Sequence, residues 1–205
     1  EGQQYFYLQE MFSPSGGIQI QYPILMAEYP FRCKEDIEDY LNLLKLTPSY
    51  FASLNDFEQE KFTRGFGMPD YSLAKVIDQC NFLITEESLK NNDHFLITTF
   101  SERLLNAVDE KIITKKEASA YATQNRQYLS RYFLPAYKNL ASSLSEFYGL
   151  GKNENGLSRF SDGKAYYEWL FSSVTGSNIP VSEAYQTLSE DYYNSMTTLQ
   201  QDLLV

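Results

Sequence analysis

Apolar residues recur along most of this chain at the three- and four-residue spacing that places them on one face of a helix. The clearest apolar stripe lies in residues 34–46, where it runs through Ile37, Tyr40, Leu41 and Leu44. Glu35 falls in the first turn of this segment, where its charge complements the helix dipole. The pattern therefore predicts a helix from residue 34 to residue 46.

Thr47-Pro48 is predicted to end this helix and to start a second one, because proline suits the first position of a helix. The second helix is expected to run to about residue 63. Similar stripes predict helices at residues 70–84, 86–90, 93–108, 163–174 and 180–203. The helix that ends at residue 108 has two candidate starts, Asp93 and Thr98.

The longest amphipathic run covers residues 115–148 and begins with a capping box at Thr114 and Glu117. At a rise of about 1.5 Å per residue, this run would span about 50 Å. Pro135 lies inside it and removes one backbone hydrogen bond, so we expect a kink there and not a stop. Gly149 and Gly151 are predicted to end this long kinked helix.

The first 32 residues have a weaker pattern, which predicts an irregular N-terminal segment. Residues 17–22 alternate between apolar and polar types, as is typical of a strand, so a short β-hairpin near the N-terminus is an open alternative. Pro23 and Pro30 argue against a long strand. Residues 25–27 are compatible with one helical turn between these two prolines.

No repeat, low-complexity segment or linker divides the chain. We therefore predict one all-α domain over residues 1–205, an irregular multi-helix bundle. It would comprise the irregular segment 1–32, short helices at 33–112, and a long helix followed by two more helices at 113–205.

The last predicted helix has a pronounced apolar face. The residues expected to point inward are Ala184, Tyr185, Leu188, Tyr192, Met196 and Leu199. This pattern continues to the end of the chain without a cap or turn signal, so we expect the chain to be a fragment of a longer protein.

Composition narrows the classes of partner. The formal net charge is −10, and the longest basic run is Lys115-Lys116. This argues against nucleic acid and anionic membranes, because Lys and Arg residues hold both. No run approaches the ~20 apolar residues of a membrane-spanning helix, so no transmembrane segment is predicted. Aromatic residues make up 16% of the chain, and tyrosine suits half-buried helix faces and grooves for peptide or carbohydrate alike.

Few residues have an obvious catalytic or metal-binding chemistry. His94 is the only histidine, and a metal site or general base would need partners that are not near it in sequence. We expect it in a surface loop or at a helix cap. Cys33 and Cys80 are expected to be free buried thiols, with a disulfide as the alternative. No catalytic residue, metal ligand or cofactor is therefore assigned to this chain.

Residues 156–170 form the most specific stretch, in which two glycines bracket a polar turn before a dense aromatic helix. Aromatic stripes at helical spacing usually belong to the core. The functional interpretation is a groove wall, in which Arg159 would bind an anion or a carboxylate and Tyr166 or Tyr167 would donate hydrogen bonds.

Several motifs occur in a fixed order along the chain. The downstream set is Pro135-Ala136-Tyr137-x-x-Leu140, Gly156-Leu157, Gly163-x-x-Tyr166-Tyr167, and Thr175-Gly-Ser with Pro180 and Glu183. The upstream set is Ser15-Gly16-Gly17, Asp36-x-x-x-Tyr40-Leu41, Pro48-x-Tyr50 and Gly65-x-Gly67-x-Pro69. In this order, and over nearly all of the chain, the motifs resemble the bacterial domain-of-unknown-function family 885.

The resemblance implies a helical, zinc-dependent metallopeptidase whose H-E-x-x-H helix lies in the C-terminal half of the protein. This chain has no such motif. The resemblance therefore implies that the chain is the non-catalytic N-terminal to middle part, that zinc belongs only to the complete protein, and that the missing C-terminal part is its partner. It also implies an exported lipoprotein at the cell surface, with a peptide cleft lined on its substrate side by Arg159, Gly163, Tyr166 and Tyr167.

Two other functions remain open at this stage. One is a self-contained helical binding module of the cell surface, which would take peptide or glycan in a tyrosine-rich groove. The other is a complete enzyme that uses carboxylates from distant helices. Adjacent carboxylates on one helix point about 100° apart, so only a facing pair from two elements would favour that enzyme.

Overall fold

The computed structural model describes residues 3–151 and 155–203, and within them every regular element is a helix. The α-helices are α1 (Ile18–Glu28), α2 (Lys34–Thr63), α3 (Asp70–Leu83), α4 (Glu86–Asn91), α5 (Phe95–Asp109), α6 (Lys115–Tyr128), α7 (Leu134–Ser145), α8 (Gly163–Thr175) and α9 (Val181–Leu203). The shorter segments are η1 (Gln3–Leu8), η2 (Leu129–Phe133) and η3 (Gly156–Arg159). The all-α prediction is confirmed.

The chain divides into two compact units. The central unit comprises residues 10–153 and holds α1 to α7. The terminal unit comprises residues 1–9 and 154–205 and holds η1, η3, α8 and α9. A single domain over the whole chain stays a prediction.

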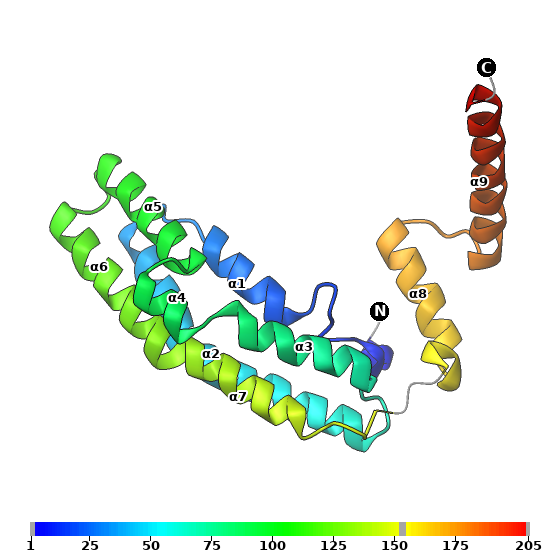
Figure 1. The fold of residues 1–205 in the computed structure, drawn as a ribbon, viewed down its shortest axis with the longest axis horizontal. Coiled ribbons are helices and arrows are strands. Elements are labelled where there is room, and N and C mark those ends of the chain that lie inside the picture. Colours follow the sequence, from blue (N-terminus) through cyan, green and yellow to red (C-terminus); the bar gives the residue numbers. More distant parts are fainter. Residues whose placement is uncertain (1–2, 152–154, 204–205) are drawn as a thin grey trace. The chain divides into compact units, whose positions relative to one another are not determined.

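The central unit is a bundle in which α7 packs along both α2 and α3, while α5 packs against α6 (Figure 1). α1 contacts α5 and α3. Aromatic side chains fill much of the interior, and the largest fully buried ones are Tyr40, Tyr137, Phe12, Phe100 and Phe133. Because these side chains fill the interior, a functional site in this unit is expected at its surface.

Residues 18–28 form helix α1, so the predicted irregular segment 1–32 and the alternative β-hairpin are both wrong there. The buried residues of α1 are Gln19, Pro23 and Met26, which have helical spacing. The sequence pattern did not predict this buried stripe, because glutamine is usually exposed to solvent. The buried amide of Gln19 instead donates to Ser13 O at 2.7 Å and to Gln79 Oε1 at 2.8 Å.

Pro23 lies inside α1 and cannot donate a hydrogen bond to the carbonyl of Gln19, four residues earlier. The hydroxyl of Tyr137 on α7 donates to that carbonyl at 2.9 Å. A side chain from a distant helix therefore satisfies the group that the proline leaves open, and α1 continues through it.

Residues 34–63 form one continuous helix, α2, so the predicted break at Thr47-Pro48 is wrong. The hydroxyl of Thr47 donates to Leu43 O at 3.1 Å, and the hydroxyl of Tyr22 approaches the same oxygen at 3.3 Å. These side chains stabilise the turn that Pro48 disturbs. The buried stripe of Leu44 also continues in register into the second half of the helix.

The run predicted at residues 115–148 forms α6, η2 and α7 in succession. The capping box at Thr114 and Glu117 is confirmed. Pro135 is the second residue of α7. The segment η2, which directly precedes α7, is π-helical. A π turn widens the helix at the carbonyl that a proline cannot bond, so the helix passes Pro135 without a stop. α7 ends at Ser145.

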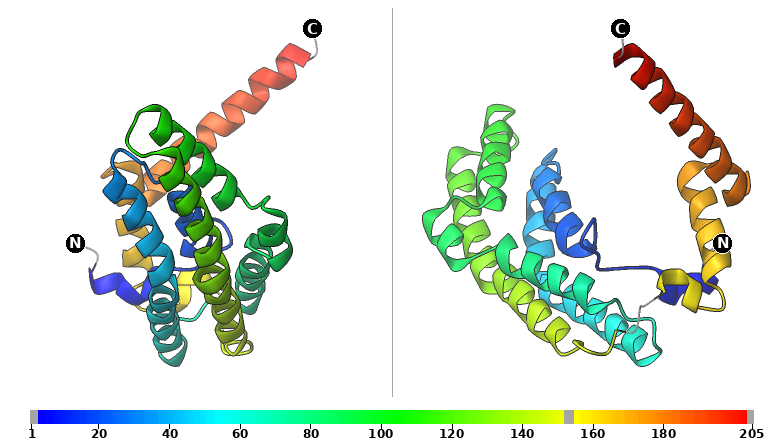
Figure 2. Two further views of the ribbon diagram at one scale, coloured as in Figure 1. Left: turned by 90° about the vertical axis from the view of Figure 1, so that its left-hand side faces the viewer. Right: turned by 45° about the vertical axis from the view of Figure 1, so that its right-hand side comes forward.

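In the terminal unit, α9 follows α8 (Figure 2), and no other element of this unit packs along it among the described residues. Of the residues predicted to point inward, only Ala184 is buried. The prediction is wrong for the exposed residues Tyr185, Leu188, Tyr192, Met196 and Leu199. An amphipathic pattern shows which face of a helix is apolar, but it does not show which element packs against that face.

Candidate functional site

The four residues singled out by sequence lie at the joint between η3 and α8 in the terminal unit. Gly163 is buried at the first position of α8, and a Cβ there would collide with the backbone of Leu157. The amide of Gly163 donates to Phe160 O at 3.0 Å, and the amide of Phe160 donates to Leu157 O at 3.1 Å. A glycine is therefore required for η3 to fold closely against the start of α8.

Tyr166 is buried in an aromatic cluster, the Tyr166 cluster, that joins η1 to α8. Its ring centroid lies 5.5 Å from that of Tyr5 and 5.8 Å from that of Trp169, and Tyr5 and Trp169 are 5.7 Å apart. Rings at these separations gain stabilisation beyond their buried area. Tyr166 therefore anchors α8, as expected of a core residue.

Tyr167 follows Tyr166 but points to another side of α8, and 49% of the residue is exposed. Successive helical residues point about 100° apart, so burial of one tyrosine leaves the other accessible. The guanidinium of Arg159 lies over the Phe160 ring, 4.4 Å from its centroid. The structure thus separates a packed pair, Gly163 and Tyr166, from Tyr167 and Arg159, whose binding roles stay predictions.

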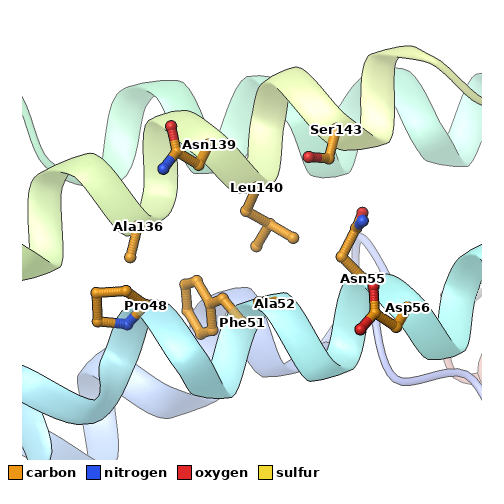
Figure 3. Close-up of a pocket in the computed structure, with 9 residues that line it drawn as sticks. All are labelled: Pro48, Phe51, Ala52, Asn55, Asp56, Ala136, Asn139, Leu140 and Ser143. Carbon is orange, nitrogen blue, oxygen red and sulfur yellow. The ribbon is translucent and has the colours of Figure 1, made fainter.

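A small pocket of about 160 Å³ lies between α2 and α7 in the central unit (Figure 3). Its lining residues are Pro48, Phe51, Ala52, Asn55, Asp56, Ala136, Asn139, Leu140 and Ser143. Asn55 points from α2 toward α7 near Ser143, and its Oδ1 atom is buried without a hydrogen-bond partner among the described residues. The pocket can therefore take a small group that donates a hydrogen bond.

The sequence did not indicate this pocket, because Asn55 and Asp56 read as solvent-facing residues of an amphipathic helix. A volume of about 160 Å³ is below the ~300 Å³ of typical small-molecule sites. It suits a side chain of a peptide or part of a sugar ring.

Two charged residues of α2, Glu58 and Lys61, are buried, which was not predicted. Lys61 Nζ lies 3.3 Å from Glu58 Oε1, and Glu58 Oε2 has no hydrogen-bond partner within the described part of the chain. Burial raises the pKa of Glu58, although Lys61 opposes the shift. Glu58 follows Phe51 by seven residues, so the helical period places it on the buried stripe. Its salt-bridge partner is Lys61, while the charge of Glu10 adds to the upward shift of its pKa.

His94 caps α5. Its Nδ1 accepts a hydrogen bond from the Leu96 amide at 3.2 Å, and its Nε2 lies 3.0 Å from Leu83 O, so Nε2 holds the proton. Burial lowers the pKa of His94. The helix-cap prediction is confirmed. The surface-loop alternative is wrong, because only 5% of the residue is exposed.

Both cysteines are free, as predicted. Cys80 is buried, and desolvation raises the pKa of its thiol to about 12. Cys33 is exposed at the N-cap of α2, so the prediction that it is buried is wrong. A residue just before a helix begins does not share the apolar face of that helix.

In residues 3–151 and 155–203, no group of three or more His, Cys, Asp and Glu side chains is arranged to hold a metal ion. Over the same residues, none of the helices combines the length and the apolar character needed to cross a bilayer.

The sequence matches a family model over residues 1–199, and the description of that family is "Bacterial protein of unknown function (DUF885)". No curated protein matches the sequence. Among solved structures, the fold is similar to a crystal structure described as "the putative lipoprotein from Colwellia psychrerythraea", with a TM-score of 0.72 and 17% identity. The match covers 86% of this chain and 29% of that one, so this chain spans less than a third of the length of the solved protein. At this identity the likeness shows the fold alone.

Proposed function

The chain belongs to the DUF885 family of bacterial proteins of unknown function, and from that premise we propose that it is the non-catalytic, N-terminal helical part of a larger exported, metallopeptidase-like protein. The length of the solved relative supports a larger protein, and its description as a lipoprotein supports a place at the outer face of the cell. The described residues do not provide the ligand set that a peptidase zinc needs. No metal-dependent step is therefore assigned to them.

In this proposal α8 forms one wall of a peptide cleft. The observation that supports this cleft wall is the different burial of two adjacent tyrosines. Tyr166 is packed against Tyr5 and Trp169, while Tyr167 remains half exposed. A binding group is most effective on an element that packing holds rigid. The hydroxyl of Tyr167 can donate to a peptide carbonyl, and the guanidinium of Arg159 can pair with a peptide carboxylate.

The test uses the complete protein in a peptide-hydrolysis assay with zinc. Tyr167→Phe removes one hydrogen bond, so we expect KM to rise by about 2- to 10-fold with little change in kcat. Tyr71→Phe, an exposed tyrosine of α3, is the matched control and should change neither parameter. The cleft-wall role is refuted if Tyr167→Ala leaves kcat/KM unchanged.

The non-catalytic assignment has its own test. The 205-residue chain alone should show no zinc-dependent peptide hydrolysis. Hydrolysis by this chain that a chelator abolishes and zinc restores would overturn the assignment.

The pocket between α2 and α7 favours a second candidate, a binding module for peptide or glycan. The supporting observation is the buried Oδ1 atom of Asn55, which has no partner among the described residues. Saturable binding of a peptide or glycan by the 205-residue chain, lost in Asn55→Ala and kept in the exposed control Asn194→Ala, would support this function. The absence of binding across both ligand classes would eliminate it.

A further inference from the structure

Helix α9 presents a continuous apolar stripe to solvent. At 100° per residue, the stripe lies within an arc of about 80° along the whole helix. We call it the α9 stripe, and its members are Val181, Tyr185, Leu188, Tyr192, Met196, Leu199 and Leu203. Exposure is 74% for Tyr185 and 66% for Leu188, so apolar surface is open along the helix.

The length of this surface marks it as an interface. A helix of 23 residues is about 34 Å long. Single exposed apolar residues are common, but a contiguous apolar patch on this scale usually meets a partner. Ala184 is the one residue of α9 that is buried among the described residues, so the terminal unit itself does not cover the stripe.

The charges on α9 restrict the chemistry of that partner. The helix has four carboxylates and no Lys or Arg, and the last basic residue of the whole chain is Lys164. Asp191 and Asp202 project about 80–100° from the centre of the α9 stripe, so both line the same edge. They are about 16 Å apart along the axis, which is three helical turns. A complementary partner has an apolar face with Lys or Arg along one edge.

These charges disfavour a second copy of this chain as the partner. An antiparallel pair of α9 helices would bring the Asp191 and Asp202 edges of two copies together, and the chain has a net charge of −10. A segment of the same polypeptide meets neither obstacle and benefits from a high effective concentration. The solved relative is about three times as long as this chain, judged from the shares of the two chains that match, so such a segment has room to exist.

We propose that a basic amphipathic helix from the remainder of the longer polypeptide packs on the α9 stripe. This inference rests on the part of the proposed function that makes the chain one portion of a larger protein. It does not depend on peptidase activity.

Hydrogen exchange tests whether the stripe is covered. The amides of residues 181–203 should exchange at least about tenfold more slowly in the complete protein than in the 205-residue chain. In the complete protein, Leu188→Asp should abolish that protection, whereas Thr187→Asp, on the opposite side of α9, should leave it intact. Equal exchange in the complete protein and the 205-residue chain overturns the proposal.

Photo-crosslinking identifies what covers the stripe. With p-benzoylphenylalanine in place of Tyr192, the complete protein should give an intramolecular adduct to a segment that contains Lys or Arg. An adduct between two copies would instead identify a second copy and overturn the proposal. The double variant Asp191→Lys with Asp202→Lys should lower the protection of α9 by about tenfold, since it reverses the charge of the edge. Unchanged protection contradicts the basic edge.

The outcomes separate this inference from the proposed function. A complete protein that protects α9 but hydrolyses no peptide upholds the docked helix and refutes the metallopeptidase. A complete protein that hydrolyses peptides while α9 exchanges freely does the reverse.

Discussion

Helices α2 and α9 have the same kind of amphipathic pattern, but the apolar face of α2 is buried and that of α9 is exposed. In the central unit, the apolar stripe of α2 is packed against α7, and Leu44 is completely buried. In the terminal unit, the α9 stripe faces solvent, and Leu188 is 66% exposed. The comparison shows that periodicity identifies the face of a helix that needs a partner, while the partner itself is a property of the rest of the protein.

Tyrosine has a different role in each of the two units. Tyr137 is buried in the central unit, and its hydroxyl satisfies the backbone carbonyl that Pro23 leaves open. In the terminal unit, Tyr185, Tyr192 and Tyr193 are all exposed. A high tyrosine content therefore supports both a specific core and a surface prepared for contact.

The largest expected effect comes from the same substitution made in both units. Leu44→Ala should lower the free energy of unfolding of the 205-residue chain by about 2–5 kcal/mol, because it removes buried contacts and leaves a cavity. Leu188→Ala should change it by less than about 0.5 kcal/mol. Chemical denaturation followed by circular dichroism measures both values. A large loss from Leu188→Ala would show that α9 is already packed in this chain.

The elements that sequence predicted well are those whose stripes are buried by neighbours in the central unit, such as α3 and α5. The errors arose where distant side chains decide the local structure. Gln19 is buried because Ser13 and Gln79 satisfy its amide, and α2 continues past Pro48 with support from the Tyr22 hydroxyl. No local pattern contains these partners.

The candidate site was predictable only in part. Sequence placed Gly163, Tyr166 and Tyr167 at one joint, but it could not show which tyrosine is buried. That choice depends on Tyr5, at the far end of the chain. The burial of Glu58 was not predicted, because a charged residue is expected at the surface. Its position seven residues after the core residue Phe51 nevertheless places it on the buried face of α2.

The second prediction concerns the joint that holds α8. Gly163→Ala should destabilise the terminal unit by about 1–3 kcal/mol, because the new Cβ collides with the Leu157 backbone. Trp169 is the only tryptophan and lies in the Tyr166 cluster, so its emission reports on this unit alone. The melting temperature from Trp169 emission should fall, while the main circular-dichroism transition stays in place.

Gly176→Ala is the control for this experiment. Gly176 has a φ of 67° with open space at its Cβ position, so it should cost only about 1 kcal/mol through backbone strain. If both probes shift together for Gly163→Ala, the two units unfold as one and the contrast between them fails.

Helix caps give a smaller effect that also differs between the units. The Thr114 hydroxyl accepts a hydrogen bond from the Glu117 amide at 3.2 Å at the start of α6. Thr114→Ala should therefore cost about 1 kcal/mol. Asp162 precedes α8 without a side-chain cap hydrogen bond, so Asp162→Ala should cost less. Urea denaturation of the two variants measures the difference, and a reversed order would contradict the assigned caps.

The smallest expected effect is the pH dependence that His94 confers on the central unit. Burial holds the pKa of His94 below its ordinary value of 6.5, so the unfolded chain binds this proton more readily than the folded one. The stabilisation is complete above pH 6.5 and is lost as pH falls from 6.5 through the folded pKa. His94→Asn keeps a capping acceptor but cannot titrate. Since His94 is the only histidine, the variant should show a flatter stability profile just below pH 6.5, with both profiles parallel at higher pH. A profile of the same slope in both proteins would mean that His94 is already accessible to protons in the folded state.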